Sequence, residues 1–187
     1  MEITAGKNGE FIIKYEDGTV AIDPNQDKNY TITMLTAKDD TSKGENLVLD
    51  WPGEYEASNV LCTSIQVLEN DIEYRIINLE VDGFKMVFFG NNPKLIPEKV
   101  LKSLSNVEIL ALPLNMGVKD MQVLVEEIEP AITLIAKDDS YKDEEGNLKF
   151  EKYLKILGQE NIESSDSLKI KSKEELETIN NFIALNV

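Results

Sequence analysis

Residues 11–24 read FIIKYEDGTVAIDP. Two runs of apolar and β-branched residues, 11–15 and 19–22, lie on either side of an Asp-Gly pair, and this order is typical of a β-hairpin. In residues 30–35 threonine alternates with apolar residues, which predicts a further strand with one buried face. The start of the chain therefore predicts β-structure built from short, closely spaced strands.

The strand pattern continues to residue 89, after which helical spacing appears. Residues 60–68 and 72–81 are apolar-rich runs that flank an Asn-Asp turn and predict a long hairpin. In the second half we expect helices from residue 97, over 121–128 and over 148–157, and strands over 107–112, 131–136, 168–171 and 179–185. This order predicts an α/β fold with two sheets inside and helices outside, as one domain over residues 1–187.

The chain is strongly acidic, with a formal net charge of −16 at pH 7. Nucleic-acid backbones and anionic membranes are polyanions, so we expect neither as a partner. A solvated acidic surface is the favoured interpretation of this charge; a basic protein partner, or mimicry of nucleic acid by the acidic surface, is the alternative. The sequence shows no leader pattern and no apolar run long enough to span a bilayer, which predicts a cytoplasmic protein.

The chain contains one cysteine, Cys62, and no histidine. This composition excludes an intramolecular disulfide, a Ser-His-Asp triad and a Cys–His nucleophile pair. Cys62 lies in an apolar run and is expected to be a buried small hydrophobe. Neither a phosphate-binding Gly-Lys-Ser/Thr loop nor a G-x-S-x-G elbow is present. We therefore predict no catalytic residue and no cofactor.

Four strings of the sequence carry a family resemblance. They are GTVAIDP at 18–24, PGEYE at 52–56, FFGN at 88–91 and IEP at 128–130. With the order of elements, they resemble the metallo-β-lactamase superfamily, and most nearly its ascorbate-phosphate-lactonase-like branch. The resemblance covers nearly the whole chain and implies an αββα metallo-β-lactamase-like sandwich in a small, trimmed version.

The metal-binding motifs of that family are not preserved. The family has Gly-His after its first strand, a His-x-His-x-Asp-His loop, a His-x-Gly-Asp strand end and a final histidine. By alignment of register, the former metal-site positions are Lys7, Ala37, Asp39, Asp40, Ser42, Phe88, Asn91 and Lys137. In this register Thr41 takes the aspartate position of the loop, and a shift of one residue would give it to Asp40.

These replacements predict that zinc does not bind. Catalytic zinc needs imidazole and carboxylate ligands with an open position for water, and alanine and phenylalanine offer no lone pair. Asp39, Asp40 and Asn91 offer oxygen ligands that suit Mg²⁺ or Ca²⁺ weakly, but protonated Lys7 and Lys137 repel a dication. We expect the lysines to form salt bridges with these aspartates; an acid–base or anion-binding site is the alternative.

Residues 51–56, WPGEYE, admit both a structural and a functional interpretation. Pro-Gly is a turn signal, and Glu54 and Glu56 share a strand face without other catalytic groups nearby in sequence, so we favour a turn over a catalytic pair. Trp51 is expected to be a partly buried core aromatic, with a partner contact as the alternative.

The sequence leads to one functional hypothesis with two alternatives. We expect a catalytically inactive metallo-β-lactamase-like protein, a pseudoenzyme that acts by binding, most readily to a protein partner. The first alternative is a metal-dependent hydrolase of phosphorylated or lactone substrates that uses an unusual carboxylate-rich site. The second is an anion-binding module that holds a small anion in the vestigial pocket.

Overall fold

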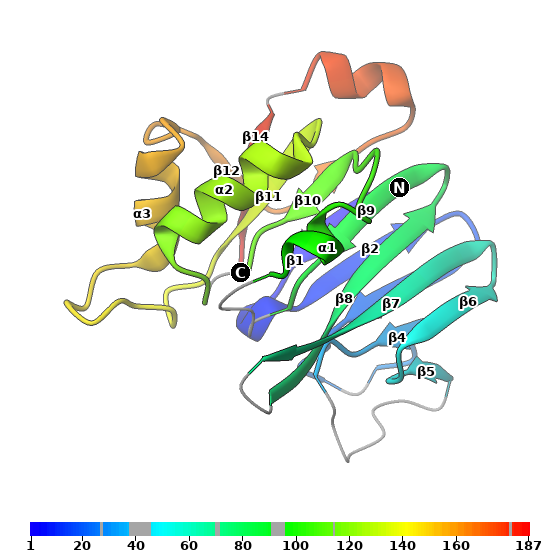
Figure 1. Cartoon of the computed structure of the whole chain (residues 1–187). Coiled ribbons are helices and arrows are strands. Elements are labelled where there is room, and N and C mark those ends of the chain that lie inside the picture. The colour runs from blue at the N-terminus through cyan, green and yellow to red at the C-terminus, as the bar shows by residue number, and fades with distance from the viewer. Residues whose placement is uncertain (27, 38–45, 70–71, 91–95, 114, 180) are drawn as a thin grey trace.

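Short strands joined by tight turns fill the first half of the chain, and the computed structural model arranges them in two sheets (Figure 1). The structure describes residues 1–26, 28–37, 46–69, 72–90, 96–113, 115–179 and 181–187. The predicted sites Asp39, Asp40, Ser42 and Asn91, and Thr41 with them, lie outside the described residues.

The first sheet is mixed and has six strands in the order β13-β1-β2-β3-β4-β5. Its strands are β1 (Glu2–Ala5), β2 (Phe11–Tyr15), β3 (Gly18–Ile22), β4 (Ile32–Met34), β5 (Leu47–Leu49) and β13 (Leu168–Lys169). The hairpin predicted from residues 11–24 is confirmed as β2–β3, which pair antiparallel with Ile13 opposite Val20. Strands β3, β4 and β5 then run parallel.

The second sheet has eight strands in the order β12-β14-β11-β10-β9-β8-β7-β6. Its strands are β6 (Gly53–Ala57), β7 (Val60–Glu69), β8 (Ile72–Val81), β9 (Phe84–Phe88), β10 (Ile109–Ala111), β11 (Ile132–Lys137), β12 (Ser164–Ser165) and β14 (Phe182–Asn186). The long hairpin β7–β8 is confirmed, and β8 turns into β9 through Asp82 and Gly83, whose φ values of 51° and 78° suit a tight hairpin turn. From β9 to β12 the strands are parallel.

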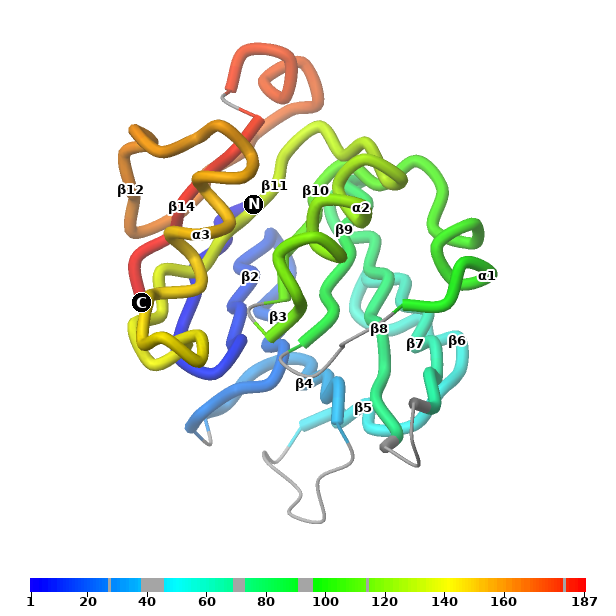
Figure 2. The backbone as a smooth tube through the Cα atoms, turned by 60° about the vertical axis from the view of Figure 1, so that its left-hand side comes forward, coloured from blue at the N-terminus to red at the C-terminus, as the bar shows by residue number. Residues whose placement is uncertain are grey.

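Three α-helices follow β9 in sequence: α1 (Glu98–Leu101), α2 (Val118–Ile128) and α3 (Lys149–Ile156). Two short 3₁₀ segments, η1 (Lys7–Gly9) and η2 (Lys173–Glu177), occur near the ends of the chain. The α-helices contact one another in the order α1–α2–α3 and lie along the second sheet (Figures 1 and 2). Within the described residues no α-helix precedes Glu98.

The spacing of apolar residues in the sequence predicts the extent of helix α2 well and that of helix α1 less well. Met121, Leu124 and Ile128 form the buried face of α2 at helical spacing, as predicted. Helix α1 has only 4 residues, although Leu104 beyond its end is still buried. None of the described helices is long and apolar enough to cross a membrane.

The core lies between the two sheets, where inward-facing side chains of both meet. Phe11 of β2 and Phe88 of β9 are both buried, and their ring centroids lie 5.3 Å apart. Such tilted aromatic pairs contribute beyond the area that they bury. Phe88, which the family resemblance predicted to be a former metal-site position, therefore serves the core that holds the sheets together.

Candidate functional site

Several segments that follow strands converge at one end of the sandwich. The loop Lys7–Asn8 follows β1, Asp23 follows β3, Thr36 follows β4, and Asp138 follows β11. The backbone N–H of Asn8 donates to Asp138 Oδ2 at 2.9 Å, although the two residues are 130 positions apart. The fold thus brings together the same kind of strand ends on which the sequence predicted a vestigial site.

Asp138 is the central carboxylate of this cluster. Its side chain is buried, and its Oδ1 accepts hydrogen bonds from the backbone N–H of Ser140 at 2.9 Å and from Ser140 Oγ at 2.5 Å. Burial alone would raise the pKa of Asp138, but the Ser140 and Asn8 hydrogen bonds and the charge of Lys7 outweigh it and hold the pKa below its usual value. Asp138 is therefore an ionised carboxylate whose two oxygens are already bound by the protein.

Asp23 is the second carboxylate, and it too is bound internally. Its Oδ1 accepts a hydrogen bond from the backbone N–H of Thr36 at 2.8 Å, and its Oδ2 accepts one from Thr36 Oγ1 at 2.5 Å. Gly90 packs against the same pair, since a Cβ at that position would meet Thr36 Oγ1 at 1.9 Å and Asp23 Oδ2 at 3.0 Å. This close approach, with a φ of +64°, requires glycine at the end of β9.

Tyr141 lies close enough to Asp138 and Asp23 for their charges to raise the pKa of its phenol. Burial, then the charge of Asp138, then that of Asp23 raise the pKa of its phenol to about 12. The phenol is therefore neutral at physiological pH and cannot act there as a base.

A buried arginine anchors the segment after β4. Arg75 of β8 is 1% exposed, and its Nη1 donates to the carbonyl oxygen of Leu35 at 2.9 Å and to that of Ala37 at 3.3 Å. Its backbone N–H also donates to the Thr36 carbonyl oxygen at 2.6 Å, and Glu73 lies 3.8 Å from Nη2. The β7–β8 hairpin thus places a positively charged side chain against the segment that follows β4.

The structure brings some of the predicted positions together and separates others. Lys7 and Lys137 line one cavity of about 270 Å³ with Asp138, Asp139 and Ser140. The Lys137 ammonium, however, has its described partners on other elements: it lies 3.3 Å from Ser164 Oγ and 5.7 Å from the centre of the Phe150 ring.

Two further positions are parts of the scaffold. Phe88 lies in the core, and Ala37 forms a β-bridge with Tyr74. The salt bridges predicted between the lysines and Asp39 or Asp40 concern aspartates outside the described residues.

Sequence reasoning missed the residues around which the cluster is built. The last metal-bearing strand end was assigned to Lys137, but the buried group is its neighbour Asp138. Asp23 was read as part of a family string and not as a site residue. Asp23 directly follows the buried end of β3, and Asp138 follows β11 with only the partly buried Lys137 between it and the buried run 132–136. An aspartate after an apolar strand run is the only signal that the sequence gives for the two. Arg75 gives no such signal, because only the pairing of β8 shows that it is buried.

The residues present do not fit the zinc site implied by the fold. The chain has no histidine, and burial raises the pKa of its single thiol, Cys62, to about 12. Asp23 and Asp138 are committed to backbone and hydroxyl donors, and Lys7 adds positive charge beside Asp138. Across the described ranges no three Cys, Asp or Glu side chains group as metal ligands. The two carboxylates cross-link loops through hydrogen bonds, a structural role that a bound metal ion has in other proteins.

The exposed face of β6 carries two more residues singled out from the sequence. Glu54 and Glu56 lie on the same face of this strand and are both exposed, whereas Tyr55 between them is partly buried and donates to the Trp51 carbonyl oxygen at 2.9 Å. Trp51 is 63% exposed, so the prediction of a core aromatic was wrong. Trp51 directly precedes the Pro52–Gly53 pair at which β6 begins.

Comparison with known proteins gives a result for structure alone. No protein-family model matches the sequence, and no curated protein matches it either. A Thermotoga maritima protein named for the Zn-dependent hydrolases of the metallo-β-lactamase superfamily matches 99% of this chain and 98% of its own, with a TM-score of 0.78 and 17% identity.

Two further solved structures match less closely. An isothiocyanate hydrolase from Delia radicum gut bacteria matches 92% of this chain and all of its own, with a TM-score of 0.64 and 12% identity. A Parabacteroides distasonis protein named as a metal-dependent hydrolase matches 83% of this chain and 89% of its own, with a TM-score of 0.60 and 17% identity. At these identities the matches establish architecture and not chemistry. This chain of 187 residues therefore has the metallo-β-lactamase-like α/β fold, in a small version with two mixed sheets.

Proposed function

We propose that this chain is a catalytically inactive metallo-β-lactamase-like protein, a pseudoenzyme that acts by binding, and that its partner is another protein. The observation that carries the proposal is the state of Asp138. This carboxylate follows β11, is buried, and accepts three hydrogen bonds from Asn8 and Ser140. Its hydrogen bonds join the segment after β1 to the segment after β11, which is a structural role.

A binding role is supported by what surrounds that carboxylate. Lys7 and Asp138 offset each other's charge, Phe88 fills the space at the end of β9, and Arg75 holds the segment after β4. Each feature stabilises the scaffold of the fold without supplying a nucleophile or an activated water. The negative net charge and the exposed Trp51 both suit recognition of a protein surface.

Metal analysis and hydrolysis assays test the proposal together. Untagged full-length protein should contain less than stoichiometric zinc, manganese or iron after purification, and added Zn²⁺ should not raise its melting temperature. We expect no turnover of phosphoester or lactone substrates above that of a D138A control. A bound transition metal that survives mild chelation, or turnover that D39A abolishes while stability is kept, would refute the proposal.

The second candidate is the anion-binding module, which the cavity between Lys7 and Lys137 favours. Two lysines and two aspartates, Asp138 and Asp139, line this cavity, so its lining side chains carry no net positive charge. Phosphate and citrate at millimolar concentration should therefore leave the melting temperature unchanged. A rise that K7M removes and that K171M, on the exposed surface, keeps would favour the anion-binding module instead.

A further inference from the structure

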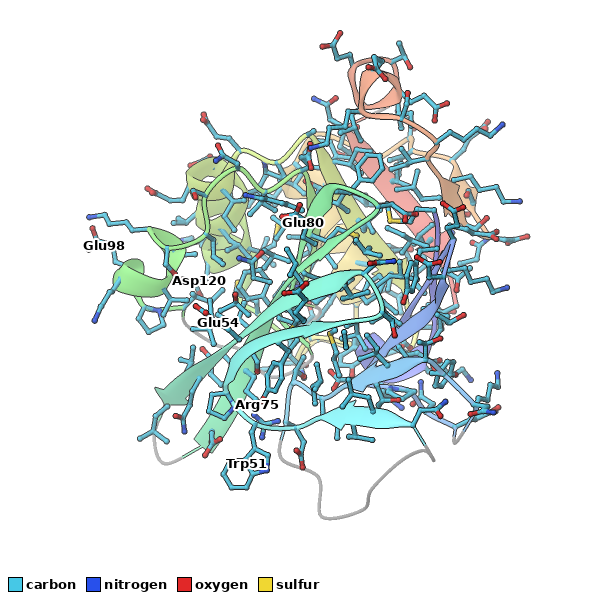
Figure 3. All side chains as sticks on the ribbon, turned by 90° about the vertical axis from the view of Figure 1, so that its right-hand side faces the viewer. Trp51, Glu54, Arg75, Glu80, Glu98 and Asp120 are labelled. Carbon is cyan, nitrogen blue, oxygen red and sulfur yellow. The ribbon has the colours of Figure 1, made fainter. Side chains whose placement is uncertain are left out.

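The outer face of the second sheet is left open at one end. Helices α1, α2 and α3 lie along the parallel half of the sheet, and the strands β6 and β7 extend beyond them (Figure 1). Strand β6 is the last in the sheet and pairs with β7 only. Figure 3 looks onto this side of the molecule, with Glu54 and Glu80 on it and Trp51 at its lower end.

Strand register defines which side chains share this open face. Glu54 of β6 lies opposite Thr63, which lies opposite Asn78, and Glu56 lies opposite Leu61, which lies opposite Glu80. Glu80 is in turn paired with Lys85 of β9. Because side chains alternate along strands, these residues project from one side of the sheet. We call them the β6–β8 face: Glu54, Glu56, Leu61, Thr63, Asn78 and Glu80.

The β6–β8 face is hollowed and carries an exposed apolar residue. A cavity of about 290 Å³ is lined by Glu54, Leu61, Glu80 and their neighbours. Leu61 is 46% exposed in the middle of this face. A branched apolar side chain flanked by polar groups in a hollow is a typical place for an apolar anchor of a partner.

The charges of the β6–β8 face are unbalanced. It holds three glutamates, with Lys85 beside it, and none of these glutamates forms an ion pair with any residue that the structure describes. Other acidic residues that the structure describes do have lysine partners, such as Glu108 with Lys173 and Asp143 with Lys152. The glutamates of the face are therefore available to cations of another molecule.

We infer that the β6–β8 face docks a basic, amphipathic segment of a partner protein, an inference that rests on the proposed binding function. Lysine or arginine side chains would pair with Glu54, Glu56 and Glu80, and an apolar side chain would pack on Leu61. A second copy of this chain is a poor occupant, because it would bring the same glutamates and a net charge of −16 against this face. Nucleic acid and anionic lipid are repelled for the same reason.

The test measures binding of a labelled synthetic peptide rich in lysine and leucine to the full chain by fluorescence anisotropy. The variant E54Q/E80Q should weaken binding at least about tenfold, and L61S at least about threefold. The matched control E160Q/E177Q makes the same change in net charge with exposed glutamates elsewhere and should alter binding less than about twofold. Circular dichroism establishes that each variant is folded.

Three results would overturn the inference. The first is equal weakening by both double variants, which means that only bulk charge is sensed. The second is binding of the wild-type chain to phosphatidylserine vesicles instead of the peptide. The third is a concentration-dependent dimer, seen by sedimentation, that E54Q/E80Q dissociates. Metal content and hydrolysis of the wild-type chain are measured in the same preparation. Hydrolysis by the wild-type chain would refute the proposed function. Peptide binding that is equally strong in the wild type and in E54Q/E80Q would refute only this docking face.

Discussion

At the scale of single residues, the difference between Asp138 and Asp139 shows how burial assigns roles. The two aspartates are adjacent, yet Asp138 is 2% exposed with three hydrogen bonds while Asp139 is exposed at the surface. A buried carboxylate is stable as an ion only when donors replace its water, and here Asn8 and Ser140 supply them. The loop after β11 is therefore held in place by this one side chain.

Replacing Asp138 with asparagine should lower the free energy of unfolding by about 1–3 kcal/mol, because the amide nitrogen cannot accept the hydrogen bond from one of its donors. D139N, the matched control, should change it by less than about 0.5 kcal/mol. Urea unfolding measures both. Since the folded pKa of Asp138 is lowered, its contribution is present above the ordinary value of 3.8 and is lost as the pH falls toward the lowered pKa. An equal loss in both variants would show that Asp138 has no special role.

Tyr141 should titrate with a pKa of about 12 in the folded protein. Ultraviolet absorbance of the tyrosinate reports this, and Y141F should remove one high-pKa component. Because the raised pKa keeps the folded phenol neutral, its contribution to stability is complete below pH 10 and is lost as the pH rises toward 12. A difference spectrum for Y141F centred near pH 10 would contradict the placement of Tyr141 beside Asp23 and Asp138.

At the scale of elements, the β7–β8 hairpin connects the two sheets. Each strand has 10 residues. Only the second half of β8, from Ile77, pairs with β9, and the first half extends beyond β9 to the segment after β4. There Tyr74 bridges to Ala37, and Arg75 bonds the Leu35 and Ala37 carbonyl oxygens. A buried guanidinium is costly to desolvate, and here two backbone acceptors at Nη1 and Glu73 near Nη2 offset part of that cost, while Nε has no hydrogen-bond partner among the described residues.

The variant R75M should lower the free energy of unfolding by about 1–3 kcal/mol, because buried carbonyl oxygens lose their donor. Faster hydrogen exchange of the Arg75-position amide, which donates to Thr36, should accompany the loss. R75K keeps the charge but cannot bond both carbonyls in the same plane, and it should fall between R75M and the wild type. The exposed K14M, on β2, is the control. Unchanged exchange in R75M would mean that the strands alone hold the segment after β4.

At the scale of the whole molecule, charge and fold make separate contributions. The apolar core between the sheets specifies the architecture, while a net charge of −16 opposes compaction through repulsion among surface carboxylates. Several of these carboxylates form local salt bridges with lysines, as Asp143 does with Lys152, but the net charge stays strongly negative.

Raising sodium chloride from low concentration to about 0.15 M should raise the melting temperature, because the Debye length falls to about 8 Å and repulsion is screened. Most of the gain should occur below that concentration. Potassium chloride at equal ionic strength should act equally, which separates screening from binding of a particular cation. A melting temperature that falls with salt would show that attractive ion pairs, and not repulsion, dominate the surface.

The fold was accessible to sequence reasoning because local patterns and global topology agree. The FIIKYEDGTVAIDP hairpin, the long β7–β8 hairpin and the helix at Met121–Ile128 are each encoded by nearby residues, through periodicity and turn signals. Helix α1 was shorter than its spacing suggested, since Leu104 is buried through tertiary contact beyond the helix end. The absence of histidine followed from composition alone and needed no structure.

The sequence by itself thus determined the order of the elements, the layered α/β architecture and the lack of imidazole ligands, because these depend on residue type and local spacing. The tertiary structure decided which charges are buried. Asp138 rather than Lys137 is the buried group, Arg75 lies inside the sandwich, and Trp51 lies outside it. Burial of a charged side chain depends on donors and acceptors that come from distant strands, and local sequence does not record where those strands meet.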